Sequence, residues 1–579
     1  MRRSRWSLPR DGDFAMTNEL AARSGGRILV DSLRIHGADR AFCVPGESYL
    51  DVLNAFHDTP ELNVVVCKHE GAAANMAEAD GRLTGRPGIC FVTRGPGATH
   101  ASIGVHAAME NSTPMVLFIG QVDRAFFDRE AFQEIDYRQM FRPLAKWAAQ
   151  IEDPSRIPEY VLRAFQTATA GRPGPVVLAL PEDMLAQTAQ VADTKPFQTA
   201  YSGPRDVDLA ALQSELAQAQ RPLLVLGGSG WTAEACAEVT AFAEASDLPV
   251  VASFRRQDLF DNTHDHYAGH LGLGINPRLA EKVRSADLLV VLGSRLSEVT
   301  SGGYTLIASP CPEQRLVHVH PDPEELGRVY QATLFINSGT AAFAAALKSL
   351  MPIKSPAWRP WLTELRRDLE AFYRPPAPDA EYRGVHLATV VSQLTESLPR
   401  DAIVCNGAGN YTLWVHRFHK YRQFRSELAP VGGAMGYGLP AAIAAKLRHP
   451  DRTVVCFAGD GCFLMYPQEL ATAAQCGAAI IVLVVNNGMY GTIRMHQERR
   501  YPGRVSSTDL ANPDFVGLAR SFGAYAERVS TTEDFAGAFG RAQRAGGPAL
   551  LELCVDPAQI TPTARLATAK PVGVESSRP

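Results

Sequence analysis

Residues 453–487 read TVVCFAGDGCFLMYPQELATAAQCGAAIIVLVVNN and hold two apolar runs, at 453–458 and 480–485, each followed by polar residues. Gly459-Asp460-Gly461 comes after the first run and Asn486-Asn487 after the second, with 24 residues between the two motifs. Because residues 467–477 have helical composition, the stretch predicts one right-handed strand–helix–strand unit. Both polar motifs should then lie at the carboxyl edge of a parallel sheet, where α/β folds bind ligands.

The same alternation of apolar, β-branched runs with helix-like stretches continues along the whole chain. It predicts an α/β fold with three doubly wound parallel-sheet domains. We predict twelve strands in three groups, at 40–44, 63–68, 88–93 and 115–120; 223–226, 249–252, 288–293 and 316–320; and 403–406, 453–458, 480–485 and 549–555.

Two stretches rich in proline and polar residues, at 187–206 and 351–378, separate the three groups and are predicted interdomain linkers. The predicted domains span residues 17–190, 205–350 and 380–560, and residues 561–579 are expected to form a tail. Residues 1–15 have an unstructured composition, which makes Met16 an alternative start.

The composition excludes several classes of protein. A formal net charge of −4 gives no electrostatic reason to expect nucleic acid as a partner. The ten cysteines form no C-x-x-C pair, so they indicate buried thiols in a reducing compartment and not disulfides or a zinc site. Since the chain has no secretory signal and no apolar run of about 18 residues, we expect a cytoplasmic protein without a membrane partner.

The two polar motifs together predict a metal site. A carboxylate, an amide oxygen and a backbone carbonyl are the hard oxygen ligands that Mg²⁺ prefers, and Asp460, Asn487 and the carbonyl of Met489 can supply them. Gly459 and Gly461 would let the backbone come close to phosphate groups. Either motif alone is common at strand ends and in turns, and only the pair at this spacing favours a function.

This pair of motifs resembles the GDG-x24-NN motif of thiamine-diphosphate enzymes, and the chain resembles acetolactate synthase and benzoylformate decarboxylase over nearly its whole length. The resemblance implies that the third domain binds the diphosphate of thiamine diphosphate together with Mg²⁺. Cys462 stands where the family usually has serine. The cofactor-binding residues that the resemblance implies in the two motifs and in the segment NGAGNYT are Asn410, Tyr411, Gly459, Asp460, Gly461, Cys462, Asn487, Met489 and Tyr490.

Residues 432–440 (GGAMGYGLP) resemble the family segment that bends the cofactor. By that resemblance, Met435 packs beneath the cofactor and the carbonyl of Gly433 accepts a hydrogen bond from its aminopyrimidine ring. The alternative is a glycine-rich turn before a helix, with Met435 as a core residue.

Glu70 follows the apolar run 64–68 in the first domain and resembles the family's activating glutamate. In the family this carboxyl group hydrogen-bonds the cofactor's pyrimidine ring, which then ionises the reactive carbon. Taken alone, a glutamate here would be only an early helix residue that complements the helix dipole. The resemblance of residues 93–99, 111–120, 131–134 and 171–176 to acetolactate synthase favours the catalytic interpretation.

Three further catalytic candidates come from the same resemblance. Glu47 lies in the turn after residues 40–44, where benzoylformate decarboxylase presents a serine over the reactive carbon, and Gln133 belongs to the matching segment 131–134. Arg94 stands where that enzyme has a histidine and acetolactate synthase has a serine. Arg94 either forks a substrate carboxylate, with Glu47 relaying a proton, or pairs with Glu47 or a phosphate.

The central domain carries a glycine turn, Gly227-Gly228-Ser229-Gly230, that lacks the full dinucleotide fingerprint. Acetolactate synthases bind FAD in this domain, and Arg295 and Asp322 fall in comparable segments. Because residues 269–277 and 297–303 depart from the FAD-binding pattern, FAD is kept as an alternative and is not the favoured expectation.

The resemblance implies a carboligase that decarboxylates a 2-oxo acid and transfers the resulting enamine to a second carbonyl. The main alternative is a simple 2-oxo acid decarboxylase of the benzoylformate decarboxylase type, because His496 stands where acetolactate synthase has a tryptophan in the acceptor pocket. A non-catalytic homologue and a nucleotide-dependent dehydrogenase are further alternatives. In the family, the activating glutamate and the diphosphate domain belong to different subunits, so a homodimer is the smallest expected active unit and a homotetramer is the favoured state.

Overall fold

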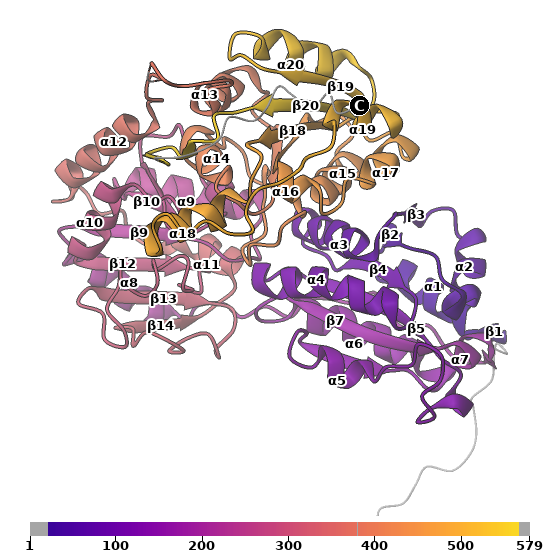
Figure 1. Cartoon of the computed structure of the whole chain (residues 1–579). Helices are drawn as coiled ribbons and strands as arrows, with labels where there is room; N and C mark the ends of the chain where they lie inside the picture. The colour runs from indigo at the N-terminus through magenta and orange to yellow at the C-terminus, as the bar shows by residue number, and fades with distance from the viewer. Residues whose placement is uncertain (1–20, 379, 567–579) are drawn as a thin grey trace, which may run out of the picture.

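The computed structural model describes residues 21–378 and 380–566, so Met1, Met16 and residues 567–579 of the expected tail lie outside the described residues. Three lobes follow one another along the chain, and each contains a six-stranded parallel sheet flanked by helices (Figure 1). The predicted α/β class and the three doubly wound sheets are confirmed.

The first sheet has the strand order β3-β2-β4-β5-β7-β6. Every residue of β4, β5 and β7 is buried, as expected for parallel strands that are covered on both faces. The strands are β2 (Arg40–Cys43), β3 (Asn63–Val66), β4 (Gly88–Val92), β5 (Met115–Gln121), β6 (Trp147–Gln150) and β7 (Pro175–Pro181). The helices are α1 (Gly25–Ile35), α2 (Leu50–His57), α3 (Glu70–Thr84), α4 (Pro96–Asn111), α5 (Tyr137–Phe141), α6 (Ile157–Thr169) and α7 (Glu182–Ala186), and β1 (Arg23–Ser24) pairs with β8 (Thr188–Ala189).

The central sheet has the order β11-β10-β9-β12-β13-β14. Its strands are β9 (Pro222–Leu226), β10 (Val250–Ala252), β11 (Tyr267–His270), β12 (Leu288–Leu292), β13 (Arg315–His320) and β14 (Leu334–Asn337). Its helices are α8 (Asp206–Ala217), α9 (Ala233–Ala245), α10 (Pro277–Ser285), α11 (Thr340–Ala346) and α12 (Arg359–Tyr373). The stretch 351–378, predicted to be a linker, contains helix α12. This part of the chain is helical because Trp361, Leu365 and Leu369 share one helical face and pack into the central core.

The third sheet has the order β16-β15-β17-β18-β20-β19. Its strands are β15 (Ile403–Asn406), β16 (Glu427–Leu428), β17 (Val454–Gly459), β18 (Ile481–Asn486), β19 (Tyr525–Val529) and β20 (Ala549–Cys554), and β21 (Gln559–Thr561) and β22 (Ala564–Arg565) form a separate hairpin. Its helices are α13 (Leu387–Ser397), α14 (Thr412–Phe418), α15 (Gly438–Arg448), α16 (Asp460–Phe463), α17 (Glu469–Gln475), α18 (Gly491–Arg500), α19 (Phe515–Ser521) and α20 (Phe535–Arg544). Strands β17 and β18 are parallel neighbours joined through α17, as predicted.

All twelve predicted strands are confirmed to within two residues at each end. The sequence prediction missed two strands in each sheet. Five of them (β6, β11, β14, β16 and β19) are edge strands that are short or carry polar residues, so they lack a long β-branched run. The sixth, β7, begins and ends in proline. Proline usually indicates the end of a strand, although it is tolerated at the first position.

The first and third lobes share one hydrophobic core. Helix α3 packs against both α4 and α15, and Figure 1 shows α3 on the side of the first lobe that faces the third. Small residues permit this close packing: a Cβ atom at Gly104 would lie 2.4 Å from that of Ala74. The left-handed Gly85 (φ +75°) ends α3.

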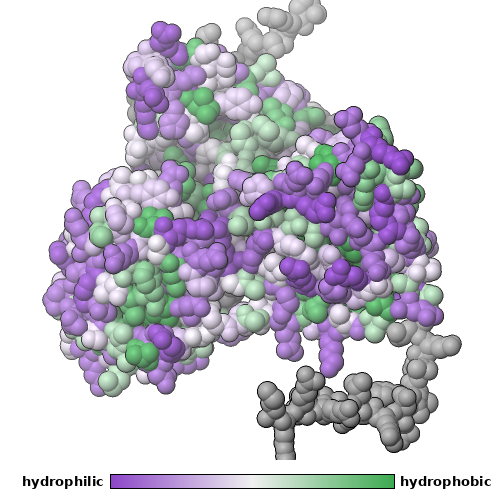
Figure 2. All heavy atoms as spheres, turned by 90° about the horizontal axis from the view of Figure 1, so that it is seen from below, coloured by the Kyte–Doolittle hydropathy of each residue, from purple (hydrophilic) through white to green (hydrophobic). Residues whose placement is uncertain are grey.

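The surface is that of an ordinary globular protein on the face shown in Figure 2, where hydrophilic residues dominate and apolar residues form small patches. Within the described part of the chain, no helix combines the length and the apolar composition needed to span a bilayer.

Candidate active site

A cavity of about 270 Å³ opens at the carboxyl edge of the third sheet. The segments that follow β15, β17 and β18 form much of its wall, and Ile560 of the β21–β22 hairpin contributes to it. All the cofactor-binding residues predicted from the sequence line this one cavity: Asn410, Tyr411, Gly433, Met435, Gly459, Asp460, Gly461, Cys462, Asn487, Met489 and Tyr490.

Asp460 presents a buried carboxylate to this cavity, with only 2% of the residue exposed. Its Oδ1 accepts from the amide of Gly461 (2.9 Å), and its Oδ2 accepts from the amide of Gly488 (2.8 Å) and from Nδ2 of Asn512 (2.8 Å). Among the described residues no arginine or lysine forms an ion pair with it, and burial raises the pKa of Asp460. A buried carboxylate with oxygen donors nearby and no cationic partner fits a divalent cation, and Asn487 and the carbonyl of Met489 could complete the donor set.

The sequence analysis missed Asn512, which holds Asp460 from a distant loop. Its Nδ2 also donates to Asn486 Oδ1 (3.0 Å), and Asn486 donates to Glu552 Oε1 (2.8 Å). The loop reaches the site because residues 508–510 bond to residues 488–490 through two backbone hydrogen bonds of 2.8 and 2.9 Å. The Asn512-Pro513 pair indicates a turn, but no spacing connects it to the metal motif.

The aromatic rings of Tyr411 and Tyr490 explain the two glycines of the GDG motif. A Cβ atom at Gly459 would lie 2.9 Å from the Tyr411 ring, and one at Gly461 would lie 2.6 Å from the Tyr490 ring. The hydroxyl of Tyr411 donates to Cys462 Sγ (3.3 Å), which also accepts from the amide of Gly436 (3.1 Å). Cys462 therefore braces the turn that follows Met435.

Gly433 and Met435 lie in this turn at the edge of the cavity. Gly433 has a left-handed backbone (φ +70°), and its Cβ position is open space. Met435 is half-buried and packs against the core cluster of the third lobe. Met435 thus has both a core contact and a face toward the cavity, so the two interpretations of this residue are compatible.

Glu70 begins α3 and is not among the residues that line the cavity of its own chain. Its Oε2 lies 2.9 Å from His100 Nδ1, and the rings of His69 and His100 stack with centroids 4.5 Å apart. His69 also caps α3 by accepting from the amide of Gly71 (3.0 Å). The activating-glutamate candidate is therefore not part of the wall that the diphosphate-binding candidates form within one chain.

Arg94, Glu47 and Gln133 come together at the carboxyl edge of the first sheet. Arg94 Nη2 donates to Glu47 Oε1 (2.9 Å), and Nη1 donates to Glu182 Oε2 (2.9 Å). The Arg94 side chain is 10% exposed and that of Glu47 is 66% exposed. Gly95 packs against Gln133, which has a left-handed backbone (φ +66°). Both ends of the guanidinium are thus engaged by carboxylates, and the exposed group of the cluster is Glu47.

The glycine turn of the central lobe is engaged by contacts within the chain. The carbonyl of Gly227 accepts from Trp231 Nε1 (2.8 Å), and that of Gly228 accepts from Arg256. The cavity beside the turn is about 80 Å³, far below the roughly 300–1,000 Å³ of typical ligand pockets. Arg295 donates to the carbonyl of Glu110 (2.9 Å), and Asp322 accepts from the amide of Glu324 (3.0 Å), so both of these candidate residues have partners within the chain.

Comparison with protein families gives one match for each lobe. Residues 23–140 match the model described as thiamine pyrophosphate enzyme, N-terminal TPP binding domain. Residues 209–347 match the thiamine pyrophosphate enzyme central domain, and residues 407–553 match the C-terminal TPP binding domain. The last of these segments contains most of the wall of the cavity.

Individual relatives are similar to this chain over most of their length. The acetolactate synthase large subunit of Parasynechococcus marenigrum is 34% identical over 526 residues, covering 88% of this chain and 84% of the relative. The acetolactate synthase large subunit of Corynebacterium glutamicum is 32% identical, covering 93% and 88%. The large subunit of acetolactate synthase isozyme 2 of Escherichia coli is 29% identical, covering 92% and 96%.

Proposed function

Because this chain belongs to the thiamine pyrophosphate enzymes, we propose that it is a carboligase dependent on thiamine diphosphate (thiamine pyrophosphate) and Mg²⁺. It would decarboxylate a 2-oxo acid and transfer the remaining acyl unit to a second carbonyl. The observation that carries this proposal is the single cavity that gathers every predicted cofactor-binding residue, in a chain similar to acetolactate synthase large subunits.

The proposed metal ligands are Asp460, Asn487 and the carbonyl of Met489. Asp460 supplies the only carboxylate among these three donors, and the N–H donors of Gly461, Gly488 and Asn512 fix its orientation. Diphosphate oxygens and water would complete the octahedron that Mg²⁺ requires.

Thiamine diphosphate, when bound, supplies a carbon atom that adds to the substrate carbonyl and stabilises the electron pair left by CO2. The chain orients the cofactor through Gly433 and Met435. Asn410 Nδ2 donates to the carbonyl of Ile560 (3.0 Å), which holds the β21–β22 hairpin at the cavity and helps to exclude water. Glu70 exchanges a proton with the pyrimidine ring: His100 engages its Oε2, which leaves Oε1 for the transfer.

We propose a homodimer as the smallest active unit, with a homotetramer as the favoured assembly. Glu70 does not line the cavity of its own chain, so a second copy of the chain would supply it. Exposed apolar side chains near the site residues support a protein partner. Phe132, beside Gln133, is 73% exposed, and Ile493 at the cavity is 53% exposed.

A simple 2-oxo acid decarboxylase of the benzoylformate decarboxylase type is the second candidate. The observation that favours it is His496, a partly exposed residue of α18, at the place where the resemblance to acetolactate synthase implies a tryptophan. The residues that bind the cofactor are the same in both candidates, so the reaction products must separate them.

The test is a screen of 2-oxo acids with the purified protein, thiamine diphosphate and Mg²⁺, each with and without a second carbonyl compound. CO2 and the organic products are measured together, and Glu70→Gln is the matched control. Hydroxyketone formation that depends on the acceptor supports the carboligase. Release of the aldehyde alone, unchanged by every acceptor, supports the decarboxylase, and cofactor binding without CO2 release would contradict both.

A further inference from the structure

The turn that carries Gly433 and Met435 is held by side chains from the other two lobes. Three consecutive residues, 429–431, each form one such hydrogen bond. Arg82 of α3 donates to the carbonyl of the first (2.7 Å), Arg255 of the central lobe donates to that of the second, and Asn111 of α4 accepts from the amide of the third (2.6 Å). The turn is thus fixed by contacts outside its own lobe.

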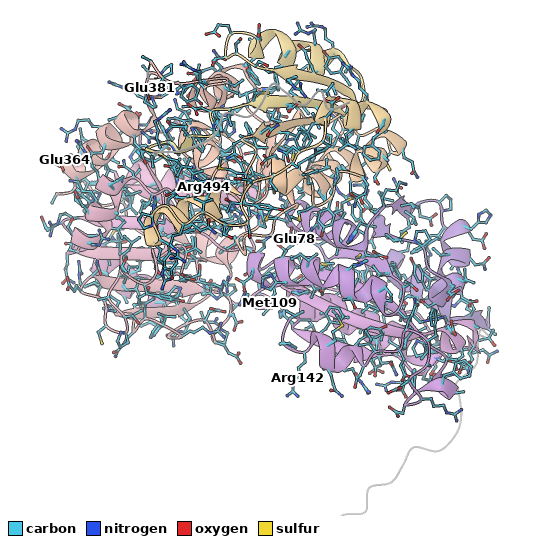
Figure 3. The ribbon with its side chains drawn as sticks, viewed as in Figure 1. Glu78, Met109, Arg142, Glu364, Glu381 and Arg494 are labelled. Atoms are coloured by element: carbon cyan, nitrogen blue, oxygen red, sulfur yellow. The ribbon has the colours of Figure 1, made fainter. Side chains whose placement is uncertain are left out.

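The Asn111 contact belongs to a buried network centred on Glu78 of α3. Glu78 accepts from Asn111 Nδ2 (2.8 Å), Thr113 Oγ1 (2.6 Å) and the hydroxyl of Tyr437, which follows the turn. Figure 3 places the labelled Glu78 where the first lobe meets the third. The turn is therefore anchored on both sides, at residues 429–431 and at Tyr437.

Arg255 alone among these side chains also bonds to a second cofactor loop. Its Nη2 donates to the carbonyl of Gly407 (2.8 Å), directly before the loop of Ala408, Gly409 and Asn410 that lines the cavity. One guanidinium thus connects the two loops. Its rigid planar fork can serve two carbonyls at once, which a lysine ammonium on a flexible chain does less well.

The environment of Arg255 is unusual for an arginine with only a packing role. The residue is 3% exposed and has a left-handed backbone (φ +59°), a conformation that residues other than glycine rarely adopt. Such strain persists only where the surroundings over-determine it, and it is frequent at functional sites. Burial lowers the pKa of Arg255 to about 10, so the group stays protonated at neutral pH. Arg82 Nη2 holds the Arg255 carbonyl (2.7 Å), which fixes the strained backbone.

We propose that Arg255 is a positioning residue for thiamine diphosphate, through which the central lobe sets the spacing of the two loops that receive the cofactor. The proposal rests on the proposed function of the cavity as the cofactor site. It also gives the central lobe a role in this chain that needs no nucleotide: Arg255 links it to the third lobe, and Arg256 closes its glycine turn.

The experiment measures thiamine diphosphate affinity by calorimetry at saturating Mg²⁺ for the full-length wild type, Arg255→Met and Arg255→Lys. The matched control is Arg256→Met, since Arg256 is the adjacent arginine and bonds to Gly228 within the central lobe. We expect Arg255→Met to weaken binding by about 10- to 100-fold, because two charge-assisted hydrogen bonds are lost. Arg255→Lys should recover part of the affinity, and Arg256→Met should bind within about threefold of the wild type.

The Tm of each protein without cofactor separates positioning from stability. A lowered Tm with wild-type affinity in both Arg255 variants would show a purely structural role and overturn the proposal. Equal losses of affinity in Arg255→Met and Arg256→Met would also overturn it. If Arg255→Met fails to fold, Arg255→Lys decides alone, with wild-type affinity counting against the proposal. Absence of binding by the wild type would instead contradict the proposed cofactor site.

Discussion

The imidazole Nδ1 of His100 lies 2.9 Å from Oε2 of Glu70. This contact joins the start of α3 to the first turns of α4, and the His69 ring stacks on the His100 ring. The carboxyl group proposed to exchange a proton with the cofactor is therefore oriented by its own chain before any partner subunit is present.

The first prediction concerns Glu70 itself. Glu70→Gln should leave the fold and cofactor binding largely intact but slow the reaction by about 10²- to 10⁴-fold, the usual effect of losing a positioned acid or base. Proton–deuterium exchange at the reactive carbon of the cofactor is the direct measurement. Exchange at the wild-type rate would remove Glu70 from the mechanism.

The second prediction concerns His100 as an orienting residue. His100→Phe keeps a ring to stack on His69 but loses the hydrogen bond, so the same exchange should slow by roughly 2- to 10-fold, in line with the loss of one hydrogen bond. His100→Gln, which can still donate to Glu70, is the control and should lie nearer the wild type. If both variants slow equally, the ring matters and the hydrogen bond does not.

The third prediction tests the metal ligands. Asp460→Ala should abolish retention of thiamine diphosphate, because the proposed Mg²⁺ site loses its only carboxylate. Asp509→Ala is the control, since Asp509 is exposed and its backbone bridge to Met489 does not depend on the carboxylate. Cofactor content and bound magnesium are measured after gel filtration. A variant at Asp460 that keeps stoichiometric cofactor in Mg²⁺-free buffer would contradict the assignment.

Sequence patterns predicted the features of this molecule that depend on residues close together along the chain. The runs that form β17 and β18 are apolar and buried, and their order along the chain already brings Asp460 and Asn487 to one edge of a sheet. Edge strands such as β16, with only two residues, give no such pattern.

Residues that act through tertiary contacts could not be predicted in this way. Arg255 bonds to carbonyls 152 and 175 residues further along the chain, and Asn512 reaches Asp460 across 52 residues. Their roles depend on how the lobes and loops pack, and no spacing in the sequence encodes that. The resemblance to known enzymes identified Glu70, but only the structure shows that His100 orients it.

The fourth prediction concerns stability and pH at the interface of the central and third lobes. Burial, with the nearby charge of Asp258, raises the pKa of Glu427 from 4.5 to about 7. Between these values the folded protein binds more protons than the unfolded chain, so the contribution of Glu427 to stability falls as the pH rises from 4.5 to about 7. Glu427→Gln should therefore raise the Tm more at pH 8 than at pH 5. The side-chain carbonyl of the introduced glutamine can still accept from the amide of Gln257, which donates to the Glu427 carboxylate at 2.7 Å in the wild type. An equal change of Tm at both pH values would contradict the prediction.

The last prediction concerns Arg94, for which the sequence left two roles open. A substrate carboxylate would have to reach a guanidinium whose side chain is only 10% exposed and which is already shared by the carboxylates of Glu182 and Glu47. The geometry therefore favours a role in positioning Glu47, whose carboxylate is the exposed group. Arg94→Ala should lower kcat/KM about tenfold. This loss is at the lower end of the range for a charge-assisted hydrogen bond, because Glu47 is largely exposed. The loss should be similar for charged 2-oxo acids and uncharged carbonyl substrates. In the Glu47→Gln background, Arg94→Ala should have little further effect, since the two residues act as one unit. A loss confined to charged substrates, and unchanged by Glu47→Gln, would instead show that Arg94 binds the substrate carboxylate directly.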